Sequence, residues 1–172
     1  MKEFPVTYND ILPEDKFQSI STYFMEGDWK LTNKSYDSDS AKLSWELKGP
    51  IELICFEVAT YIKLVIKKYI GKDIHLRSMH TNGQTFGQGS ELHRDRDDIG
   101  YYSCILFTTP QWDLQWGGEF VCKDYKGNQH SVLYKPNKAV VIPSHWEHYG
   151  ASPNVHTDTL RTSLGLIYQI AR

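Results

Sequence analysis

Residues 160–170 read Leu160-Arg161-Thr162-Ser163-Leu164-Gly165-Leu166-Ile167-Tyr168-Gln169-Ile170, and their side chains fall into two alternating sets. Successive side chains of a β-strand point to opposite faces of a sheet, so this stretch predicts a strand with one largely apolar face. If the leucine face packs outward against helices, Arg161, Ser163 and Gly165 point together into the interior of a β structure.

A guanidinium group in such an interior is costly without a partner charge, and a carboxylate that binds it in bidentate fashion is the natural partner. That carboxylate belongs either to a bound molecule or to a protein acid such as Asp158. Gly165 on the same face would leave space for a bound molecule.

The rest of the second half of the chain has the same β-rich texture. Short apolar or alternating runs are separated by Gly, Pro and Asn, which is typical of an antiparallel jelly roll or barrel. The expected strands are Asp73–His80, Glu91–Asp95, Tyr101–Thr108, Glu119–Asp124, Ser131–Tyr134, Lys138–Ile142, Trp146–Tyr149 and Leu160–Ile170.

The first part of the chain has helical periodicity instead. Apolar residues recur at helical spacing from Pro13 to Trp29 and from Pro50 to Gly71, while Asn33 to Ser44 is polar and predicts a surface loop. We therefore expect one mainly β domain over residues 1–172, with a helical support at 1–72 packed on a jelly-roll core at 73–172.

Composition excludes several functional classes. The chain has 172 residues, 40% of them hydrophobic, and a net charge of −2, so a nucleic-acid partner is not expected. The polar N-terminus lacks the apolar run of a signal peptide, and no stretch is long enough to span a bilayer. These features predict a soluble cytoplasmic protein without a membrane partner.

Three residues form a candidate metal site. His93 and Asp95 are two apart, which in a strand places both side chains on one face, and His148 follows about fifty residues later. Two histidines and one carboxylate make a facial triad, the ligand set of non-haem Fe(II) oxygenases. His145 is an alternative distal ligand, but similarity to these oxygenases favours His148, because they usually have a proline several residues after the distal histidine and Pro153 suits His148 better.

His93, Asp95, His148 and the Arg161-Thr162-Ser163 run together resemble the Fe(II)- and 2-oxoglutarate-dependent dioxygenases over roughly residues 74–170. The resemblance implies a double-stranded β-helix with Fe(II) on the triad and no catalytic side chain beyond the metal ligands. It also implies 2-oxoglutarate and O₂ as cosubstrates, with ascorbate as a further cofactor candidate. Arg161 would take the 5-carboxylate of 2-oxoglutarate, with Ser163 as a hydrogen-bonding helper.

The segment Trp112 to Phe120 resembles the Trp, spacer and Gly-Gly-Glu segment of prolyl 4-hydroxylases, although Gly-Gly is also a common hairpin device. This chain departs from those enzymes at Phe107, where several carry a tyrosine, and at Arg161, where the collagen type uses lysine. These two departures bear on the substrate and leave the metal site untouched.

Asn82 to Gly87 resembles the Asn-x-Tyr-x-x-Gly run of alkylated-base demethylases, which makes Asn82 and Gln84 candidate cosubstrate contacts, with a turn as the alternative for Asn82-Gly83. Ile167 stands where those demethylases carry a second arginine, which argues against that activity. Tyr102 is a further candidate contact in a β-run, although core packing is the more frequent role there.

The remaining histidines have no spacing partner and are interpreted as solvated or locally bonded: His75, His80, His130 and His156. The expected activity is hydroxylation of an unactivated C–H bond with conversion of 2-oxoglutarate to succinate, most simply on a prolyl residue of a protein or peptide. The alternatives are a free amino acid or other small metabolite as substrate, and a non-catalytic cupin-like binding module.

Overall fold

A computed structural model describes residues 3–34 and 43–171. Its first half contains β1 (Val6–Tyr8), α1 (Glu14–Glu26), β2 (Asp28–Lys34), β3 (Leu43–Lys48) and α2 (Ile51–Ile70). The second half contains β4 (Ile74–Gln84), β5 (Tyr101–Phe107), the 3₁₀ turn η1 (Leu114–Trp116), β6 (Phe120–Lys123), β7 (Gln129–Val132), β8 (Ala139–Pro143), β9 (Glu147–Gly150) and β10 (Arg161–Ile170).

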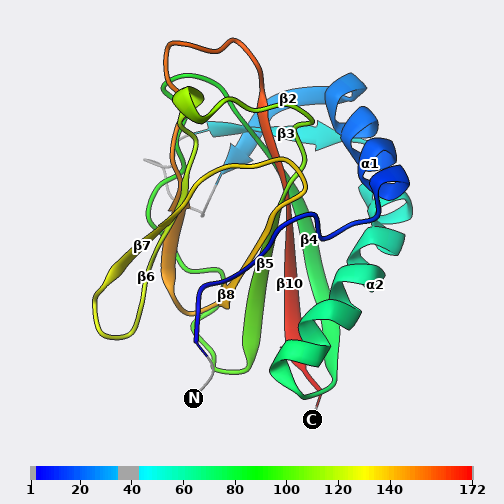
Figure 1. The fold of residues 1–172 in the computed structure, drawn as a ribbon, viewed down its shortest axis with the longest axis vertical. Coiled ribbons are helices and arrows are strands. Elements are labelled where there is room, and N and C mark those ends of the chain that lie inside the picture. Colours follow the sequence, from blue (N-terminus) through cyan, green and yellow to red (C-terminus); the bar gives the residue numbers. More distant parts are fainter. Residues whose placement is uncertain (1–2, 35–42, 172) are drawn as a thin grey trace.

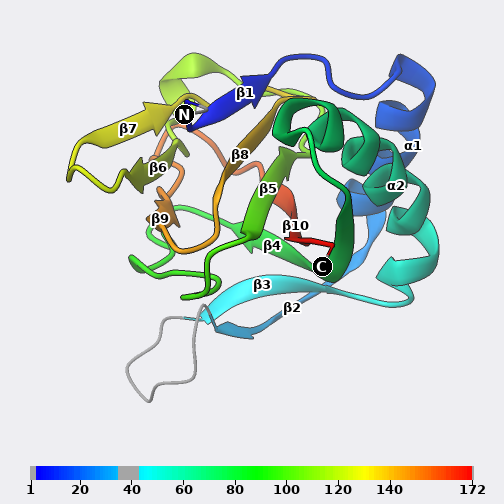
Figure 2. The same ribbon diagram turned by 90° about the horizontal axis from the view of Figure 1, so that it is seen from below.

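The strands form two sheets that face each other. The larger sheet has the order β1-β8-β5-β10-β4-β3-β2, and the smaller sheet has the order β7-β6-β9. Both views show the smaller sheet on one side of the larger one and the two helices on the other (Figures 1 and 2). This arrangement confirms the predicted jelly roll with helices on its outer face.

The helices cover the outer face because the larger sheet presents its apolar residues there. Leu164, Leu166 and Tyr168 of β10 are fully buried and join one core with the apolar residues of both helices. The Tyr168 hydroxyl donates to the Ala59 carbonyl of α2 at 2.7 Å, which ties strand and helix together. Arg161 and Ser163 therefore face the opposite side, towards the smaller sheet, as the alternation predicts.

Seven of the eight expected runs contain strands, and one does not. The segment Glu91–Asp95 is irregular apart from an isolated bridge between His93 and His148. The prediction of a strand there is wrong, because neighbouring backbone groups bond to loops instead. The Asp95 and Arg96 amides both donate to the Ser144 carbonyl, at 3.1 and 3.2 Å.

The N-terminal part is less purely helical than expected. Both predicted helices are present, but β1 pairs with β8, and the β2–β3 pair extends the larger sheet beyond β4. Gly83 permits that extension, because a Cβ there would lie 2.9 Å from Trp45 and 3.0 Å from the Trp29 ring. The ends of the predicted loop at 33–44 are strand residues, and positions 35–42 lie outside the described residues.

Across residues 3–34 and 43–171, the structure contains no helix that is both long enough and apolar enough to cross a membrane.

Candidate active site

The register of three strands places the candidate site on the inner face of the larger sheet. Directly opposite residues of antiparallel strands share a face, so each inward residue of β10 is flanked by inward residues of β4 and β5. From one end to the other, these rows are Gln84–Arg161, Asn82–Ser163–Phe107, His80–Gly165–Ile105 and Ser78–Ile167–Ser103. All of these residues except Phe107 and Ser78 line a cavity of about 260 Å³, together with the loop that carries His93 and Asp95 and with Phe120, His148 and Gly150 of the smaller sheet.

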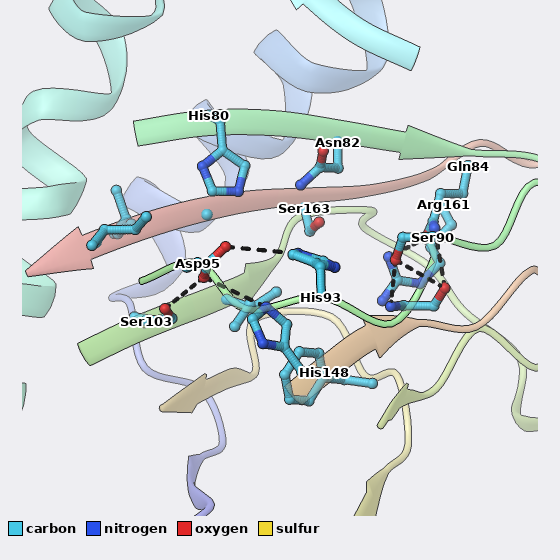
Figure 3. A pocket seen from close by; sticks show the side chains of 17 residues that line it. His80, Asn82, Gln84, Ser90, His93, Asp95, Ser103, His148, Arg161 and Ser163 are labelled. Atoms are coloured by element: carbon cyan, nitrogen blue, oxygen red, sulfur yellow. Dashed lines mark hydrogen bonds and ion pairs between the residues drawn. The ribbon is translucent and has the colours of Figure 1, made fainter. Parts of the chain in front are cut away.

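His93, Asp95 and His148 converge in this cavity (Figure 3). One ligand atom from each of the three lies within 4.8 Å of the other two. The Asp95 carboxylate is 3.7 Å from His93 Nε2 through one oxygen and 3.5 Å from His148 Nε2 through the other. The sequence prediction of these three residues as one group therefore agrees with the geometry.

The hydrogen bonds of the two imidazoles prepare them for metal binding. His93 Nδ1 donates to the Glu91 carbonyl at 2.8 Å, and His148 Nδ1 donates to the Trp146 carbonyl at 3.0 Å. With the proton held at Nδ1, each Nε2 can direct a lone pair at a shared ion, which is how metal-bound histidines are usually oriented. The donor set therefore fits a divalent transition metal that accepts two imidazoles and a carboxylate.

Electrostatics agree with this assignment for the carboxylate and for the distal histidine. Burial would raise the pKa of Asp95, but the attraction of His93, 3.7 Å away, the hydrogen bond from Ser103 and the nearby His148 hold it below its usual range. Burial lowers the pKa of His148 and keeps that ring neutral. At His93 burial lowers the pKa, but the interaction with Asp95 and the hydrogen bond to the Glu91 carbonyl together outweigh burial and raise it.

Ser103 is a positioning residue that the sequence did not reveal. Its hydroxyl donates to Asp95 Oδ2 at 2.6 Å and lies 2.8 Å from the Ser144 hydroxyl. This pair fixes the carboxylate from behind, in the way that outer-shell groups orient metal ligands. The signal was present in the alternation of β5, where Ser103 shares a face with the inward Phe107.

Arg161 is buried at the other end of the cavity, where it is 2% exposed. Its Nε donates to the Gly118 carbonyl at 2.8 Å and its Nη1 to Gln84 Oε1 at 2.7 Å. The guanidinium group also lies over the rings of Tyr134 and Phe107, 4.9 and 5.5 Å from their centroids. All of these partners are neutral, and burial lowers the pKa of Arg161 to about 10.

Within the described residues, no carboxylate lies within ion-pair distance of Arg161, so the pairing with Asp158 is not formed. Glu119 contributes only a more distant charge. A buried cation without a protein anion indicates that the anion comes from a bound molecule.

The Trp112–Phe120 segment builds the wall of this arginine pocket. Trp112 Nε1 donates to the Gly117 carbonyl at 2.9 Å, and its ring lies 4.6 Å from the Tyr134 ring. A Cβ on Gly118 would lie 2.9 Å from Arg161 Cδ and 3.1 Å from Trp112. The double glycine therefore lets the backbone approach the guanidinium group closely.

A first prediction concerns these two glycines, which both have positive φ, +70° at Gly117 and +77° at Gly118. Alanine is strained at either position, but only at Gly118 would it also press on Arg161. We expect Gly118→Ala to weaken 2-oxoglutarate binding by at least about tenfold, through loss of charge-assisted contacts, and Gly117→Ala to change it much less. Calorimetric titration of both variants with 2-oxoglutarate measures the difference, and equal weakening would contradict the assigned contact.

Three of the four other predicted cosubstrate contacts line the cavity, and one does not. Asn82, Gln84 and Ser163 are part of the lining. Gln84 already uses both ends of its amide, because its Nε2 donates to the Gly150 carbonyl at 3.2 Å, so it orients Arg161. Tyr102 was predicted wrongly: it packs against the helix-side core, since Tyr101 is the inward residue opposite Gln169.

His80 was interpreted from the sequence as solvated or locally bonded, but its side chain lines the cavity above Asp95 (Figure 3). The ring lies over Gly165, where a Cβ would be 2.2 Å from His80 Nε2. Burial lowers the pKa of His80, which favours a neutral ring. The alternation of β4 contained the signal, because His80 precedes the inward residues Asn82 and Gln84 by steps of two.

His145, the alternative distal ligand, lies outside the metal group and lines a shallow hollow elsewhere on the surface.

No protein-family model matches the sequence, and no curated protein matches it in sequence. Solved structures do match in three dimensions. An oxidoreductase of the 2OG-Fe(II) oxygenase family from Burkholderia pseudomallei aligns with a TM-score of 0.76 at 13% identity, over 95% of this chain and 84% of that one. The chain has the fold of the 2-oxoglutarate- and Fe(II)-dependent oxygenases.

Prolyl hydroxylases are among the other structures with this oxygenase fold. A prolyl-4-hydroxylase from Pseudomonas putida aligns with a TM-score of 0.64 at 19% identity, over 97% of this chain and 92% of that one. A Trichoplax adhaerens prolyl hydroxylase, in complex with a peptide fragment of hypoxia inducible factor, aligns with a TM-score of 0.68 at 14% identity, over 96% and 77%.

Proposed function

We propose that this protein is an Fe(II)- and 2-oxoglutarate-dependent dioxygenase that hydroxylates an unactivated C–H bond. The overall reaction consumes substrate, 2-oxoglutarate and O₂ and yields hydroxylated substrate, succinate and CO₂. The observation that carries the proposal is the pairing, within one cavity, of the His93–Asp95–His148 group with a buried arginine that has no carboxylate partner among the described residues.

In this proposal His93, Asp95 and His148 hold the iron, which supplies the oxygen chemistry when bound. The protein side chains bind and orient 2-oxoglutarate. Arg161 binds the 5-carboxylate of 2-oxoglutarate, Gln84 and the Gly118 carbonyl fix the plane of its guanidinium group, and the Ser163 hydroxyl donates a further hydrogen bond.

Ser103 holds the Asp95 carboxylate, and the apolar surroundings of Arg161 exclude water from the carboxylate pocket. The rings of Phe107 and Tyr134 stack 4.4 Å apart beneath the guanidinium group. A charge-assisted pair is stronger in such a site than in water, because little solvent competes for the charges.

For the substrate we propose a prolyl residue of a protein or peptide. Similarity to the Pseudomonas putida prolyl-4-hydroxylase over nearly the whole of both chains supports this choice, as does the Trichoplax adhaerens enzyme with its bound peptide. The Trp112–Phe120 segment contributes less to the choice than its sequence suggested, since its side chains form the arginine pocket.

A small metabolite is the second candidate substrate. An α-ketoglutarate-dependent epimerase and a carbocyclase, both from nogalamycin biosynthesis, have the same fold with TM-scores of 0.71 and 0.69 at 10% and 12% identity. The cavity of about 260 Å³ also suits a small molecule better than a folded polypeptide.

The second prediction separates these candidates. Proline-containing peptides should stimulate succinate formation above the substrate-free background, and mass spectrometry should find one added oxygen on proline. Free proline and methylated oligonucleotides should stimulate less. Stimulation by a free amino acid or another metabolite alone would replace the peptide assignment and leave the oxygenase assignment intact. Absence of succinate under all conditions would favour a binding module.

A further inference from the structure

Two more arginines lie at the end of the larger sheet beyond the metal group, Arg77 on β4 and Arg96 in the segment before β5. Arg77 Nε donates to Gln169 Oε1 at 2.6 Å, and the guanidinium group of Arg96 lies 5.9 Å from the centroid of the Tyr101 ring. Gln169 and Tyr101 are directly opposite each other in the β10–β5 register. Both guanidinium groups therefore contact one cross-strand pair.

This pair lies next to the metal group and far from Arg161. Tyr101 and Ser103 are two residues apart on one face, which corresponds to about 7 Å along a strand, and Ser103 donates to Asp95. Arg96 follows Asp95 directly in the chain, and the amides of both residues are held by the Ser144 carbonyl. Arg161 and Gln169 stand near opposite ends of β10, with the metal group between them.

Neither arginine forms an ion pair within the part of the chain that the structure describes. Among residues 3–34 and 43–171, no carboxylate lies within 4.0 Å of Arg77 or Arg96, whereas Arg94 is engaged by Glu147 at 3.3 Å and Asp97 at 3.8 Å. A shallow hollow of about 360 Å³ adjoins Tyr101 and Gln169, and Asp98 is the carboxylate in its lining. Neither arginine is part of this lining, but each contacts a residue that is, Gln169 for Arg77 and Tyr101 for Arg96.

We propose that Arg77 and Arg96 bind a carboxylate of the primary substrate, and this inference rests on the proposed oxygenase function. If 2-oxoglutarate occupies the space between Arg161 and the metal group, the substrate approaches from the other side, where these arginines lie. A guanidinium group binds carboxylates with well-defined geometry.

Two sources can provide this carboxylate: an acidic side chain next to the target residue of a peptide, or the free carboxylate of an amino acid or metabolite. The test uses zinc-loaded protein with saturating 2-oxoglutarate, so that Arg161 is occupied and no turnover occurs. The peptide probes are an acetylated and amidated tetrapeptide with glutamate before proline and its glutamine counterpart. The metabolite probes are N-acetylproline and its amide.

We expect the carboxylate-bearing member of at least one pair to bind more tightly than its amide, and to shift the side-chain Nε–Hε NMR signals of Arg77 and Arg96. The Arg94 signal should stay in place. Arg77→Gln and Arg96→Gln should each weaken binding of that probe by about fivefold or more, as expected for loss of one charge-assisted contact at an exposed site. Arg94→Gln is the matched control and should leave binding within about twofold.

Equal binding of the carboxylate and amide members, absence of binding by all four probes, or equal weakening by Arg94→Gln would overturn the inference. Succinate assays with the iron-loaded enzyme separate this failure from failure of the proposed function. If succinate forms without added substrate and the probes show no carboxylate preference, the oxygenase proposal stands and the proposed anion site is rejected. If a carboxylate probe binds at Arg77 and Arg96 but succinate never forms, the proposed anion site stands and the oxygenase proposal is rejected.

Discussion

His148→Ala is expected to abolish succinate formation and to weaken Fe(II) binding by more than about a hundredfold, because loss of a ligand costs at least as much as loss of an outer-shell partner. His148 is 4% exposed and its Nδ1 proton is already committed to the Trp146 carbonyl, so its Nε2 is the nitrogen available to an ion. The same loss is expected for His93→Ala and Asp95→Ala. Metal titration followed by turnover assays measures both effects, and circular dichroism checks the fold.

His145→Ala is the matched control for the distal histidine. His145 lies three residues before His148, and its ring belongs to a hollow away from the cavity. Its buried Nδ1 has no hydrogen-bond partner among the described residues, so little bonding is lost on replacement. An inactive His145→Ala together with an active His148→Ala would show that the distal ligand is misassigned.

Arg161→Leu is expected to raise the KM for 2-oxoglutarate by more than tenfold, since a charge-assisted hydrogen bond contributes about 1.5–3 kcal/mol. The protein should still fold, because leucine removes a buried cation whose partners are neutral. Saturating 2-oxoglutarate should raise the melting temperature of the wild-type protein and leave that of the variant nearly unchanged.

Arg161→Lys provides a graded comparison, because lysine keeps the charge but cannot hold Gly118 and Gln84 in the same planar arrangement. Its KM should lie between those of the wild type and Arg161→Leu. If Arg161→Leu binds 2-oxoglutarate as the wild type does, another group must hold the 5-carboxylate.

Much of the site was predictable from periodicity. The alternation in residues 160–170 correctly placed Arg161 and Ser163 inside, because a two-residue period and one identified face determine the orientation of every other side chain. The same rule, extended along β4 from Asn82 and Gln84, would have placed His80 in the cavity. The prediction for Tyr102 was wrong because the sequence of its strand did not show which face is inward, and the neighbouring Tyr101 is the inward residue.

Other features depended on contacts between distant parts of the chain. His93 and Asp95 share a site although their segment is not a strand, since bonds to residues 144 and 148 determine its path. β2 and β3 join the larger sheet through the close approach of Trp45 to Gly83, a contact between residues far apart in sequence. The contact of Gly118 with Arg161 joins residues far apart in sequence and could not be predicted. From the sequence alone, the Gly-Gly pair resembled a hairpin turn or a family motif.

The central claim is that one cavity binds Fe(II) and 2-oxoglutarate together. Anaerobic titration of the protein with Fe(II) and 2-oxoglutarate tests it most directly, because direct chelation of iron by 2-oxoglutarate gives a visible charge-transfer absorbance. We predict that this absorbance saturates at one equivalent of iron, is absent in His148→Ala and requires much more 2-oxoglutarate in Arg161→Leu. No absorbance in the wild-type protein, together with no succinate after oxygen is admitted, would contradict the claim.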